Sequence, residues 1–460
     1  MAQFTLDQVI SVTGGQLLIS GPPLFCGIST DTRSLQPGDL YVALRGERVN
    51  GHDYLEQARA QGAAGAVIGE SIPGLRRRHT ASGEWSVIEV TDTLYALGQL
   101  AQFHRRRFKI PIIGITGSAG KTTTKEMTAA ILEQGRKVLK TQGNYNNEIG
   151  MPLTIFRLEK AHEAAVLEFG MRGRGQILYL AALARPTIGV ITNVGLTHLE
   201  LLGSQEEIAL AKAELLDEMP EHSTAILLRD DDFYSLLREH APGTVVTVGE
   251  TADCDFRVGN VWLGEDGCAR FTLYTPGEDI PVQLGAPGRH QVKNALSAAA
   301  AAMTAGATTI EVQQGLAAYV PDTGRMRMLK SPHGYAVVDD SYNANPAAVR
   351  ATLEFLAEVP GTGRKVAILG DMRELGPTER DIHRQIGRYA MELGIDALLA
   401  VGDLGKEYVA GADDSRAHWY PDNAAAAHAA RELLQPGDIA LVKGSRAMKM
   451  EEIVAALITE

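Results

Sequence analysis

Cysteine is scarce in this chain, with three residues in 460. Cys26, Cys254 and Cys268 form no closely spaced pair and are too few to staple a chain of this length, which excludes a disulfide framework. We therefore expect the protein to work in a reducing compartment.

Positive charge is in deficit as well, since the formal net charge is −12 at pH 7. The chain thus lacks the overall excess of lysine and arginine that marks a broad nucleic-acid-binding surface. Hydrophobic residues make up 45% of the sequence and charged residues 22%, which is ordinary for a folded globular protein and disfavours disorder. We expect no nucleic-acid partner.

Long hydrophobic runs are also missing. Residues 1–7 have neither the basic nor the apolar region of a signal peptide. The longest apolar stretch, 295–307, is rich in alanine and falls short of the ~18–20 residues that cross a bilayer. We expect a cytoplasmic protein without stable membrane insertion. The basic run 105–109 could contact acidic lipid or nucleic acid, but a solvated helix end before a strand is the favoured interpretation.

The length of the chain corresponds to about three domains of roughly 150 residues each. Short strands and turn signals predict a small α/β unit over residues 1–85. Over residues 86–320, apolar strands, glycine loops and amphipathic helices alternate, which predicts a doubly wound sheet. A second alternating series predicts a smaller Rossmann-like domain over 321–460, joined by a hinge at 319–325. No coiled-coil heptad or long exposed strand demands association, so we expect a monomer.

Continuous apolar runs locate the strands of the two larger domains, because strands buried on both faces of a parallel sheet lack alternation. In chain order, these predicted strands are 110–116, 164–169, 188–194, 335–339, 365–369, 397–401 and 439–442. The predicted helices include 54–61, 94–107 and 123–133, one that opens at Pro346, and 380–393 ending at Gly394.

The strongest single motif is a glycine loop between a buried strand and a helix, Gly114-Ile-Thr-Gly-Ser-Ala-Gly-Lys-Thr122. Its backbone amides can wrap an anion at the helix N-terminus. Lys121 would reach the β- and γ-phosphates of a nucleotide, while the Thr122 hydroxyl would ligate magnesium. Ile115 stands where a strict P-loop has its first glycine, so the pattern is a shorter relative. A chance glycine loop is the alternative.

Three further polar residues follow the P-loop in the chain. Glu168 ends a buried strand, where open α/β sheets bind ligands, and could organise magnesium; a solvated turn residue is the alternative. His198 lies just beyond the next strand on the same edge, although a lone histidine is more often structural. Lys212 lies in an apolar helix and by default is a lysine whose stem packs while its ammonium reaches water.

The third domain carries three polar segments, each after a strand and before a helix: 339–346, 370–376 and 443–446. Strand ends of one parallel sheet share an edge, so the segments should line one rim that faces the P-loop domain across the hinge. Two domains that close on a nucleotide can exclude water from a reactive phosphorylated intermediate.

Together these residues resemble the Mur ligases, the ATP-dependent amide-forming enzymes of peptidoglycan precursor synthesis. The resemblance spans the chain and rests on 29–33 (Ser-Thr-Asp-Thr-Arg), 117–124, 143–147 (Gly-Asn-Tyr-Asn-Asn), 288–290 with Asn294, and the three C-terminal segments. The sequence lacks the Asp-Asn-Pro-Arg motif of the branch that adds the third stem residue. In its place, Gly370-Asp-Met-Arg-Glu-Leu-Gly376 resembles the dipeptide-adding branch.

The resemblance implies a role for particular residues in each domain. ATP would contact Gly117, Ser118, Ala119, Gly120, Lys121, Thr122, Thr123, Asn294, Arg325 and Asp340. Magnesium would be held by Thr122, Glu168, His198 and Lys212, the last as a carbamylated lysine; Lys121, His198 and Lys212 would be catalytic. The uridine-linked substrate would contact Ser29, Thr30, Asp31, Arg33, Asn144 and Asn147, and the dipeptide side would comprise Tyr342, Asn343, Asn345, Lys443 and Ser445.

The implied reaction joins D-alanyl-D-alanine to the terminal carboxylate of a UDP-N-acetylmuramoyl-tripeptide through an acyl phosphate. A sibling ligase that adds a single amino acid and, from another class, a P-loop switch or motor are the alternatives. The sequence leaves open whether the third stem residue is lysine or diaminopimelate, which residues grip the dipeptide, and whether the domains are open or closed.

Overall fold

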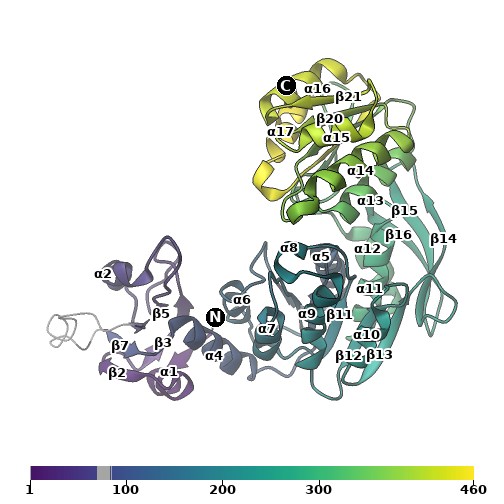
Figure 1. The fold of residues 1–460 in the computed structure, drawn as a ribbon. Coiled ribbons are helices and arrows are strands. Elements are labelled where there is room, and N and C mark those ends of the chain that lie inside the picture. The colour runs from purple at the N-terminus through teal and green to yellow at the C-terminus, as the bar shows by residue number, and fades with distance from the viewer. Residues whose placement is uncertain (1, 70–82, 84, 460) are drawn as a thin grey trace.

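The computed structural model describes residues 2–69, 83 and 85–459. Three successive parts of the chain each build a sheet that is mostly parallel, and helices cover these sheets (Figure 1). The α/β class expected from the alternating strand and helix signals is confirmed.

The N-terminal part is small, and its main sheet has the order β2-β7-β6-β5-β4, with only β2 antiparallel to its neighbour. Its strands are β1 (Phe4–Thr5), β2 (Gln16–Ile19), β3 (Leu24–Phe25), β4 (Gly27–Ser29), β5 (Asp39–Val42), β6 (Gly65–Ile68) and β7 (Ser86–Glu89). Among its described residues, the helices are α1 (Leu6–Thr13), η1 (Gly51–Tyr54) and α2 (Leu55–Ala60). The helix expected over 54–61 thus begins with a 3-10 turn.

The middle part centres on a parallel sheet in which β8 lies between β10 and β11. Its parallel strands are β8 (Ile112–Thr116), β9 (Val138–Lys140), β10 (Ala164–Glu168), β11 (Ile188–Ile191), β12 (Thr224–Leu228) and β13 (Thr244–Gly249). Its helices are α4 (Thr93–Arg105), α5 (Lys121–Leu132), α6 (Gly150–Ile155), α7 (Gln176–Ala184), α8 (Leu199–Leu202), α9 (Gln205–Asp217), α10 (Tyr234–Glu239), α11 (Gln291–Thr304) and α12 (Thr309–Ala318).

An antiparallel extension continues this sheet beyond β13, which the sequence analysis did not predict. It consists of β14 (Phe256–Leu263), β15 (Cys268–Tyr274) and β16 (Ile280–Pro287). Burial along β15 and β16 alternates between covered and more exposed residues, so one face packs on the core and the other meets solvent. Our search for continuous apolar runs could not find strands of this kind.

The C-terminal part has the strand order β17-β18-β22-β19-β20-β21, parallel except for the edge strand β17. Its strands are β17 (Arg327–Lys330), β18 (Ala336–Asp340), β19 (Lys365–Gly370), β20 (Ala397–Val401), β21 (Ala417–Tyr420) and β22 (Ile439–Lys443). Its helices are α13 (Pro346–Glu358), η2 (Gly376–Thr378), α14 (Glu379–Glu392), α15 (Gly405–Ala412), α16 (Asn423–Leu433), η3 (Arg446–Met448) and α17 (Glu451–Ile458). As expected, Pro346 opens α13, where its missing N–H costs nothing.

The basic run 105–109 is a docking element between domains. Arg105 is only 7% exposed, and its Nε donates to the carbonyl of Ala184 at 2.8 Å, which caps the end of α7. The guanidinium of Arg107 lies over the rings of Phe4 and Phe103. The favoured interpretation of a solvated helix end is therefore wrong for Arg105, because the residue satisfies carbonyls that α7 leaves unpaired.

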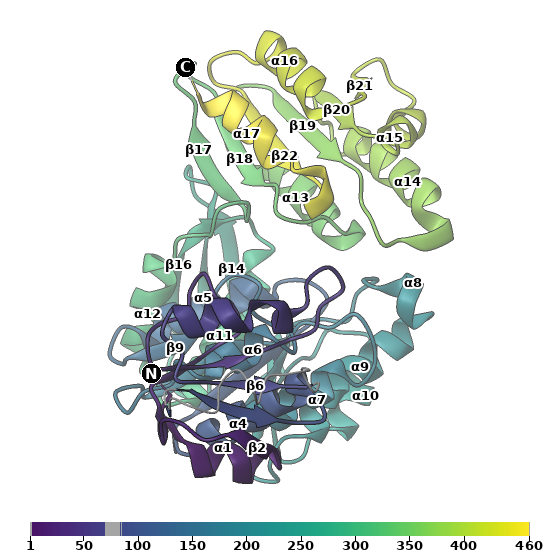
Figure 2. The same cartoon turned by 90° about the vertical axis from the view of Figure 1, so that its left-hand side faces the viewer.

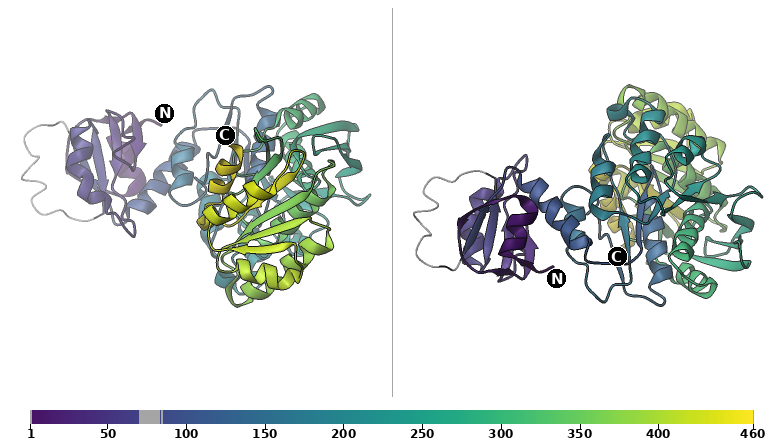
Figure 3. Two further views of the ribbon diagram at one scale, coloured as in Figure 1. Left: turned by 90° about the horizontal axis from the view of Figure 1, so that it is seen from above. Right: turned by 90° about the horizontal axis from the view of Figure 1, so that it is seen from below.

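The three parts are arranged in an L. The N-terminal part stands to one side of the middle part and is reached through α4, while the C-terminal part overlies the middle part (Figures 1 and 3). Turned by 90°, the molecule shows β17 above the β14–β16 extension (Figure 2). Among the helices of the described ranges, none is both long and apolar enough to cross a membrane.

Candidate active site

The P-loop turns tightly between β8 and α5, and its two inner glycines have backbone angles that side chains rarely adopt. Gly117 has φ 152° and Gly120 has φ 79°. A β-carbon at Gly117 would collide with the Thr192 hydroxyl, and one at Gly120 with the Asn294 amide. Only glycine fits both positions. The glycine spacing therefore reflects the close approach of the P-loop to the segments that carry Thr192 and Asn294.

Residues 192–195, just past β11, brace this loop. The amide of Ala119 donates to Oδ1 of Asn193 at 3.0 Å, and the Thr192 hydroxyl donates to the Ala119 carbonyl at 2.6 Å. Strand β11 ends at Ile191, short of the expected Val194, because the chain turns here to bind the P-loop. Gly120 is the N-cap of helix α5 and provides no side-chain cap, which leaves the first amides of the helix free to bind an anion.

Lys121 is held inside the loop, where its Nζ donates to the carbonyl of Gly117 at 2.7 Å. Burial lowers the pKa of Lys121, while the charge of Glu168 raises it and that of Arg325 lowers it further. The positive charges of Lys121 and Arg325 therefore act on the same space from two domains. A polyanion such as a triphosphate would relieve their mutual repulsion.

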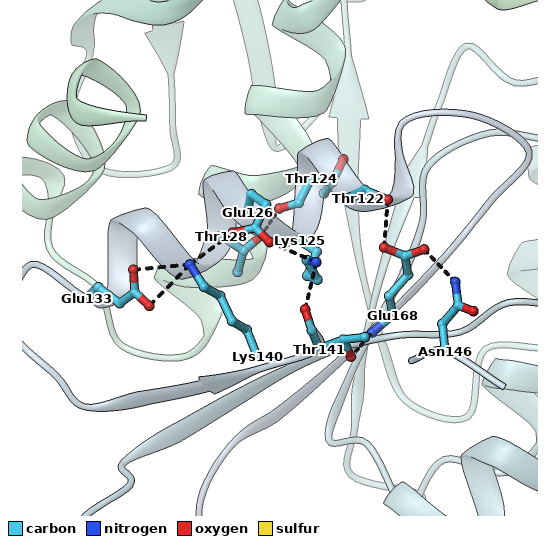
Figure 4. Close-up of polar contacts among 10 residues, drawn as sticks. All are labelled: Thr122, Thr124, Lys125, Glu126, Thr128, Glu133, Lys140, Thr141, Asn146 and Glu168. Carbon is cyan, nitrogen blue, oxygen red and sulfur yellow. Dashed lines mark hydrogen bonds and ion pairs between the residues drawn. The ribbon is translucent and has the colours of Figure 1, made fainter. Parts of the chain in front are cut away.

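Glu168 is 3% exposed at the end of β10, and two side chains hold its carboxylate (Figure 4). The hydroxyl of Thr122 donates to Oε2 and the amide of Asn146 to Oε1, both at 2.8 Å. A hydroxyl and a carboxylate are the hard oxygen ligands that magnesium prefers. The pair fits a magnesium site. With the ion bound, the Glu168 carboxylate would pair with the ion and no longer with the Thr122 hydroxyl.

His198 and Lys212 both lie within electrostatic range of Lys121 but make different contacts. His198 has φ 58°, and its Nδ1 lies 3.0 Å from Oε2 of Glu374 in the C-terminal domain. Burial lowers the pKa of His198, and the Glu374 carboxylate opposes this shift. Lys212 is 1% exposed on α9; burial and the charge of Lys121 lower its pKa well below the usual range, against an opposing effect of Asp231.

The end of the predicted hinge, at Arg325, contacts the C-terminal domain. Arg325 lies over the ring of Tyr342, with 4.1 Å from the guanidinium carbon to the ring centroid. The Asp340 carboxylate forms a close ion pair with buried Lys443 and accepts the amide of Met326 at 3.1 Å. Asp340 and Lys443 thus hold the end of the hinge to the third domain. A nucleotide ribose would have to compete with Lys443 and the Met326 amide for the Asp340 carboxylate.

A cavity of about 1030 Å³ lies between the middle and C-terminal domains. Its lining from the predicted set comprises Ser118, Lys121, Asn144, Asn147, His198, Tyr342, Asn343, Asn345 and Ser445. Its charged lining side chains are Lys121, Arg172, Arg373, Arg446, Glu148 and Glu374. Cations outnumber anions there, which suits a substrate that carries carboxylates and phosphates.

Side chains from the loop after β22 and from helices α14 and α15 hold the segment 370–374 at the cavity wall. The amide of Arg373 donates to the hydroxyl of Ser445 at 2.9 Å, and the amide of Met372 donates to Nε2 of buried His383 at 3.0 Å. The hydroxyl of Tyr408 donates to the carbonyl of Gly370 at 3.1 Å. These three hydrogen bonds tie the backbone of the segment to the rest of the C-terminal domain.

The residues expected to hold the uridine nucleotide lie elsewhere, in the N-terminal domain. Ser29 ends β4, and its hydroxyl donates to the carbonyl of Asp31 at 2.9 Å. Asp31 and Arg33 form an ion pair at 2.6 Å, and the Arg33 side chain is 87% exposed. These residues do not line the interdomain cavity. A ligand contacting both places would have to be long, as a nucleotide-linked peptide is.

Several residues of the site were missed by the sequence analysis. Asn146 holds Glu168, Arg373 and Glu374 line the cavity, and Asn193 braces the P-loop. Asn146 lies inside the motif 143–147 that carried the resemblance, and Arg373 and Glu374 lie inside the segment 370–376. The sequence therefore indicated which segments belong to the site. It could not show which side chains of a loop point into the site.

Comparisons with known proteins agree along the chain. Family models match in chain order: "Mur ligase family, catalytic domain" over 25–105, "Mur ligase middle domain" over 115–302 and "Mur ligase, glutamate ligase domain" over 324–446. The UDP-N-acetylmuramoyl-tripeptide–D-alanyl-D-alanine ligase of Synechocystis is 41% identical over 436 residues, which is 94% of this chain and 92% of the relative.

Two solved structures have the same architecture. MurF from Acinetobacter baumannii superposes with a TM-score of 0.91 at 32% identity, covering 100% of this chain and 99% of that one. MurF ligase from Thermotoga maritima, solved in complex with ADP, gives a TM-score of 0.83 at 27% identity over 94% and 96% of the two chains. The chain therefore belongs to the Mur ligase family and is an ATP-dependent ligase.

Proposed function

We propose that this chain joins D-alanyl-D-alanine to the terminal carboxylate of a UDP-N-acetylmuramoyl-tripeptide and converts ATP to ADP and phosphate. The observation that carries the proposal is the shared cavity, in which Lys121 of the P-loop and Ser445 and Tyr342 of the C-terminal domain line one space. The names of the curated relatives, which identify this same reaction, support the choice of substrates.

A carboxylate is a poor acyl donor, so the reaction needs activation. The terminal carboxylate oxygen of the tripeptide attacks the γ-phosphorus of ATP, the bond to ADP breaks, and an acyl phosphate forms. The neutral amine of the dipeptide then attacks the acyl carbon, phosphate leaves, and the amine loses a proton. In this proposal Lys121 and Arg325 stabilise the negative charge that the transferring phosphoryl group develops.

Magnesium belongs to the proposal as well, with Thr122 and Glu168 as its ligands and His198 nearby as a further one. The ion would neutralise phosphate charge when bound. The depressed pKa of Lys212 favours a neutral amine, the form that reacts with carbon dioxide to give a carbamate. A ¹³C NMR carbamate signal that appears with ¹³C-bicarbonate and is lost in Lys212→Met would support this modification, and its absence in the wild type would refute it.

We assign the remaining site residues the roles expected from the resemblance. The loop 117–123, Asn294 and Asp340 would contact ATP; Ser29, Thr30, Asp31, Arg33, Asn144 and Asn147 the uridine-linked substrate; and Tyr342, Asn343, Asn345, Lys443 and Ser445 the dipeptide side. We further propose a monomer in the cytoplasm, where the exposed free thiol of Cys26 stays reduced.

Phosphate release by the purified protein tests the proposal. We expect release only when ATP, the UDP-linked tripeptide and D-alanyl-D-alanine are all present. Release with one free amino acid in place of the dipeptide would select the sibling ligase. Turnover of ATP alone at the full rate would select a switch or motor and contradict the proposal.

A further inference from the structure

A second lysine on the P-loop helix, one turn after Lys121, is buried. Lys125 is 1% exposed, and Figure 4 shows its side chain directed from α5 towards the strand ends of the sheet. A buried ammonium destabilises a protein unless it is paired. Neither the sequence analysis nor the proposed reaction gives this residue a role.

The contacts of Lys125 join α5 to the end of β9. Its Nζ donates to the carbonyl of Thr141 at 2.8 Å and forms an ion pair with Glu126 at 2.8 Å. Glu126 also pairs with Lys140 at 2.9 Å. Burial opposes ionisation of Glu126, but the charges and hydrogen bonds of both lysines outweigh it and lower the pKa of the carboxyl. The ammonium of Lys125 is thus compensated in place.

Thr141, which Lys125 contacts, also forms a hydrogen bond with Glu168. It is fully buried, and its hydroxyl accepts the backbone amide of Glu168 at 3.0 Å. From Thr141 the chain continues into the segment that presents Asn146 to the Glu168 carboxylate. The backbone and the side chain of Glu168 are therefore both held from a segment that Lys125 ties to α5, the helix that carries Thr122 (Figure 4).

We propose that Lys125 is a positioning residue that sets the separation between the Thr122 hydroxyl and the Glu168 carboxylate, and through it the affinity for magnesium. The inference rests on the proposed magnesium site. Residues that orient metal ligands change metal affinity by about 10- to 100-fold when they are replaced. Lys125 touches neither ATP nor the reacting atoms in this account, so its effect passes through Thr141 and Glu168.

The test compares Lys125→Met with Lys140→Met. Each variant removes one ammonium from Glu126 and leaves the other, but only Lys125→Met removes the contact to Thr141. Calorimetry of ADP binding at increasing Mg²⁺ gives the Mg²⁺ concentration that half-maximally tightens ADP. We expect Lys125→Met to raise this concentration about 10- to 100-fold and to leave the KM for D-alanyl-D-alanine unchanged. Lys140→Met should behave as the wild type.

Two further variants keep the inference testable if Lys125→Met does not fold. Lys125→Arg retains a cationic donor and should keep most of the Mg²⁺ response. Thr141→Val removes the hydroxyl that holds the Glu168 amide and should raise the Mg²⁺ requirement as Lys125→Met does. Equal effects of Lys125→Met and Lys140→Met, or an unchanged Mg²⁺ requirement in Thr141→Val, would overturn the inference. If Mg²⁺ did not tighten ADP on the wild-type chain, the magnesium site itself would be refuted, and this inference with it.

Discussion

Lys121 provides the positive charge of the P-loop. Its ammonium is buried against the carbonyl of Gly117, and its charge faces that of Arg325. An isolated cation in such a place is unfavourable, so the arrangement is suited to a bound anion. The motif around Lys121 was readable from the sequence because glycine, lysine and threonine must occur at fixed spacing between a strand and a helix.

Replacing Lys121 by alanine should abolish ligation and leave the fold intact. The change removes the cation that is placed to stabilise phosphate charge, so we expect a loss of about 10³-fold in kcat, as when a charge-stabilising group is deleted. Circular dichroism and the thermal midpoint should stay near those of the wild type. Activity within tenfold of the wild type in a folded variant would remove the P-loop from the mechanism.

His104 makes the stability of the chain depend on pH. The residue is 4% exposed among Phe4, Phe108 and Phe156, and burial lowers its pKa to about 4. As the pH falls through about 6.5, His104 takes up a proton in the unfolded chain but not in the folded chain. The contribution of neutral His104 to the free energy of unfolding is therefore complete above about pH 6.5 and is lost as the pH falls towards 4.

Urea unfolding at pH 7 and pH 5 measures this contribution. We expect wild-type stability to fall by about 2 kcal/mol from His104 alone over that interval. His104→Phe keeps a ring in the pocket and should lose less stability between the two pH values than the wild type does. An equal fall in both proteins would show that His104 is not buried as a neutral ring.

At the scale of elements, the strands that were predicted well are those buried on both faces. Strands β8, β10 and β19 were predicted to within about two residues at each end because sheet burial and β-propensity agree in them. The β14–β16 extension was missed because one face of its strands is exposed. Hydrogen bonds between distant segments, such as those of Asn193 to the P-loop, depend on how the chain folds in three dimensions. They produce no local sequence pattern from which they could be predicted.

The segment 370–374 shows how such a hydrogen bond can control binding. Its Met372 amide donates to Nε2 of His383, whose ring is buried against Tyr408 with centroids 4.6 Å apart. Arg373 and Glu374 extend from this segment into the cavity lining. Its conformation therefore depends on a histidine that does not line the cavity.

Replacing His383 by leucine should loosen this segment. The change leaves the buried amide of Met372 without an acceptor, at a cost of about 1–3 kcal/mol. We expect the KM for D-alanyl-D-alanine to rise at least fivefold (about 1 kcal/mol), with the KM for ATP nearly unchanged. The exposed His418→Leu serves as the control. A parallel rise in both KM values would indicate general damage and contradict a local role.

At the scale of the whole molecule, the middle and C-terminal domains touch at the lining of the cavity. There His198 meets Glu374, and a β-carbon on Gly376 would lie 3.7 Å from that of Glu200 on α8. Both contacts would have to break for the cavity to open widely. The sequence predicted a hinge but could not predict which surfaces meet when the domains come together.

A disulfide between Glu200→Cys and Gly376→Cys tests whether the domains must part during turnover. The β-carbon separation suits a disulfide, although Gly376 has φ 59° and a side chain there costs about 1–2 kcal/mol. In a Cys26→Ser background, we expect the oxidised enzyme to lose most of its turnover and dithiothreitol to restore it. Full activity of the oxidised form would show that this contact can persist through the cycle.

The central claim is that ATP bound at the middle domain activates a peptide carboxylate for attack by an amine. Isotope transfer tests it most directly, because phosphorylation of the carboxylate moves one of its oxygens to phosphate. With ¹⁸O in the terminal carboxylate of the UDP-linked tripeptide, the account predicts one ¹⁸O atom in each phosphate released during ligation. Phosphate that contains no ¹⁸O, with amide formed at the normal rate, would contradict it.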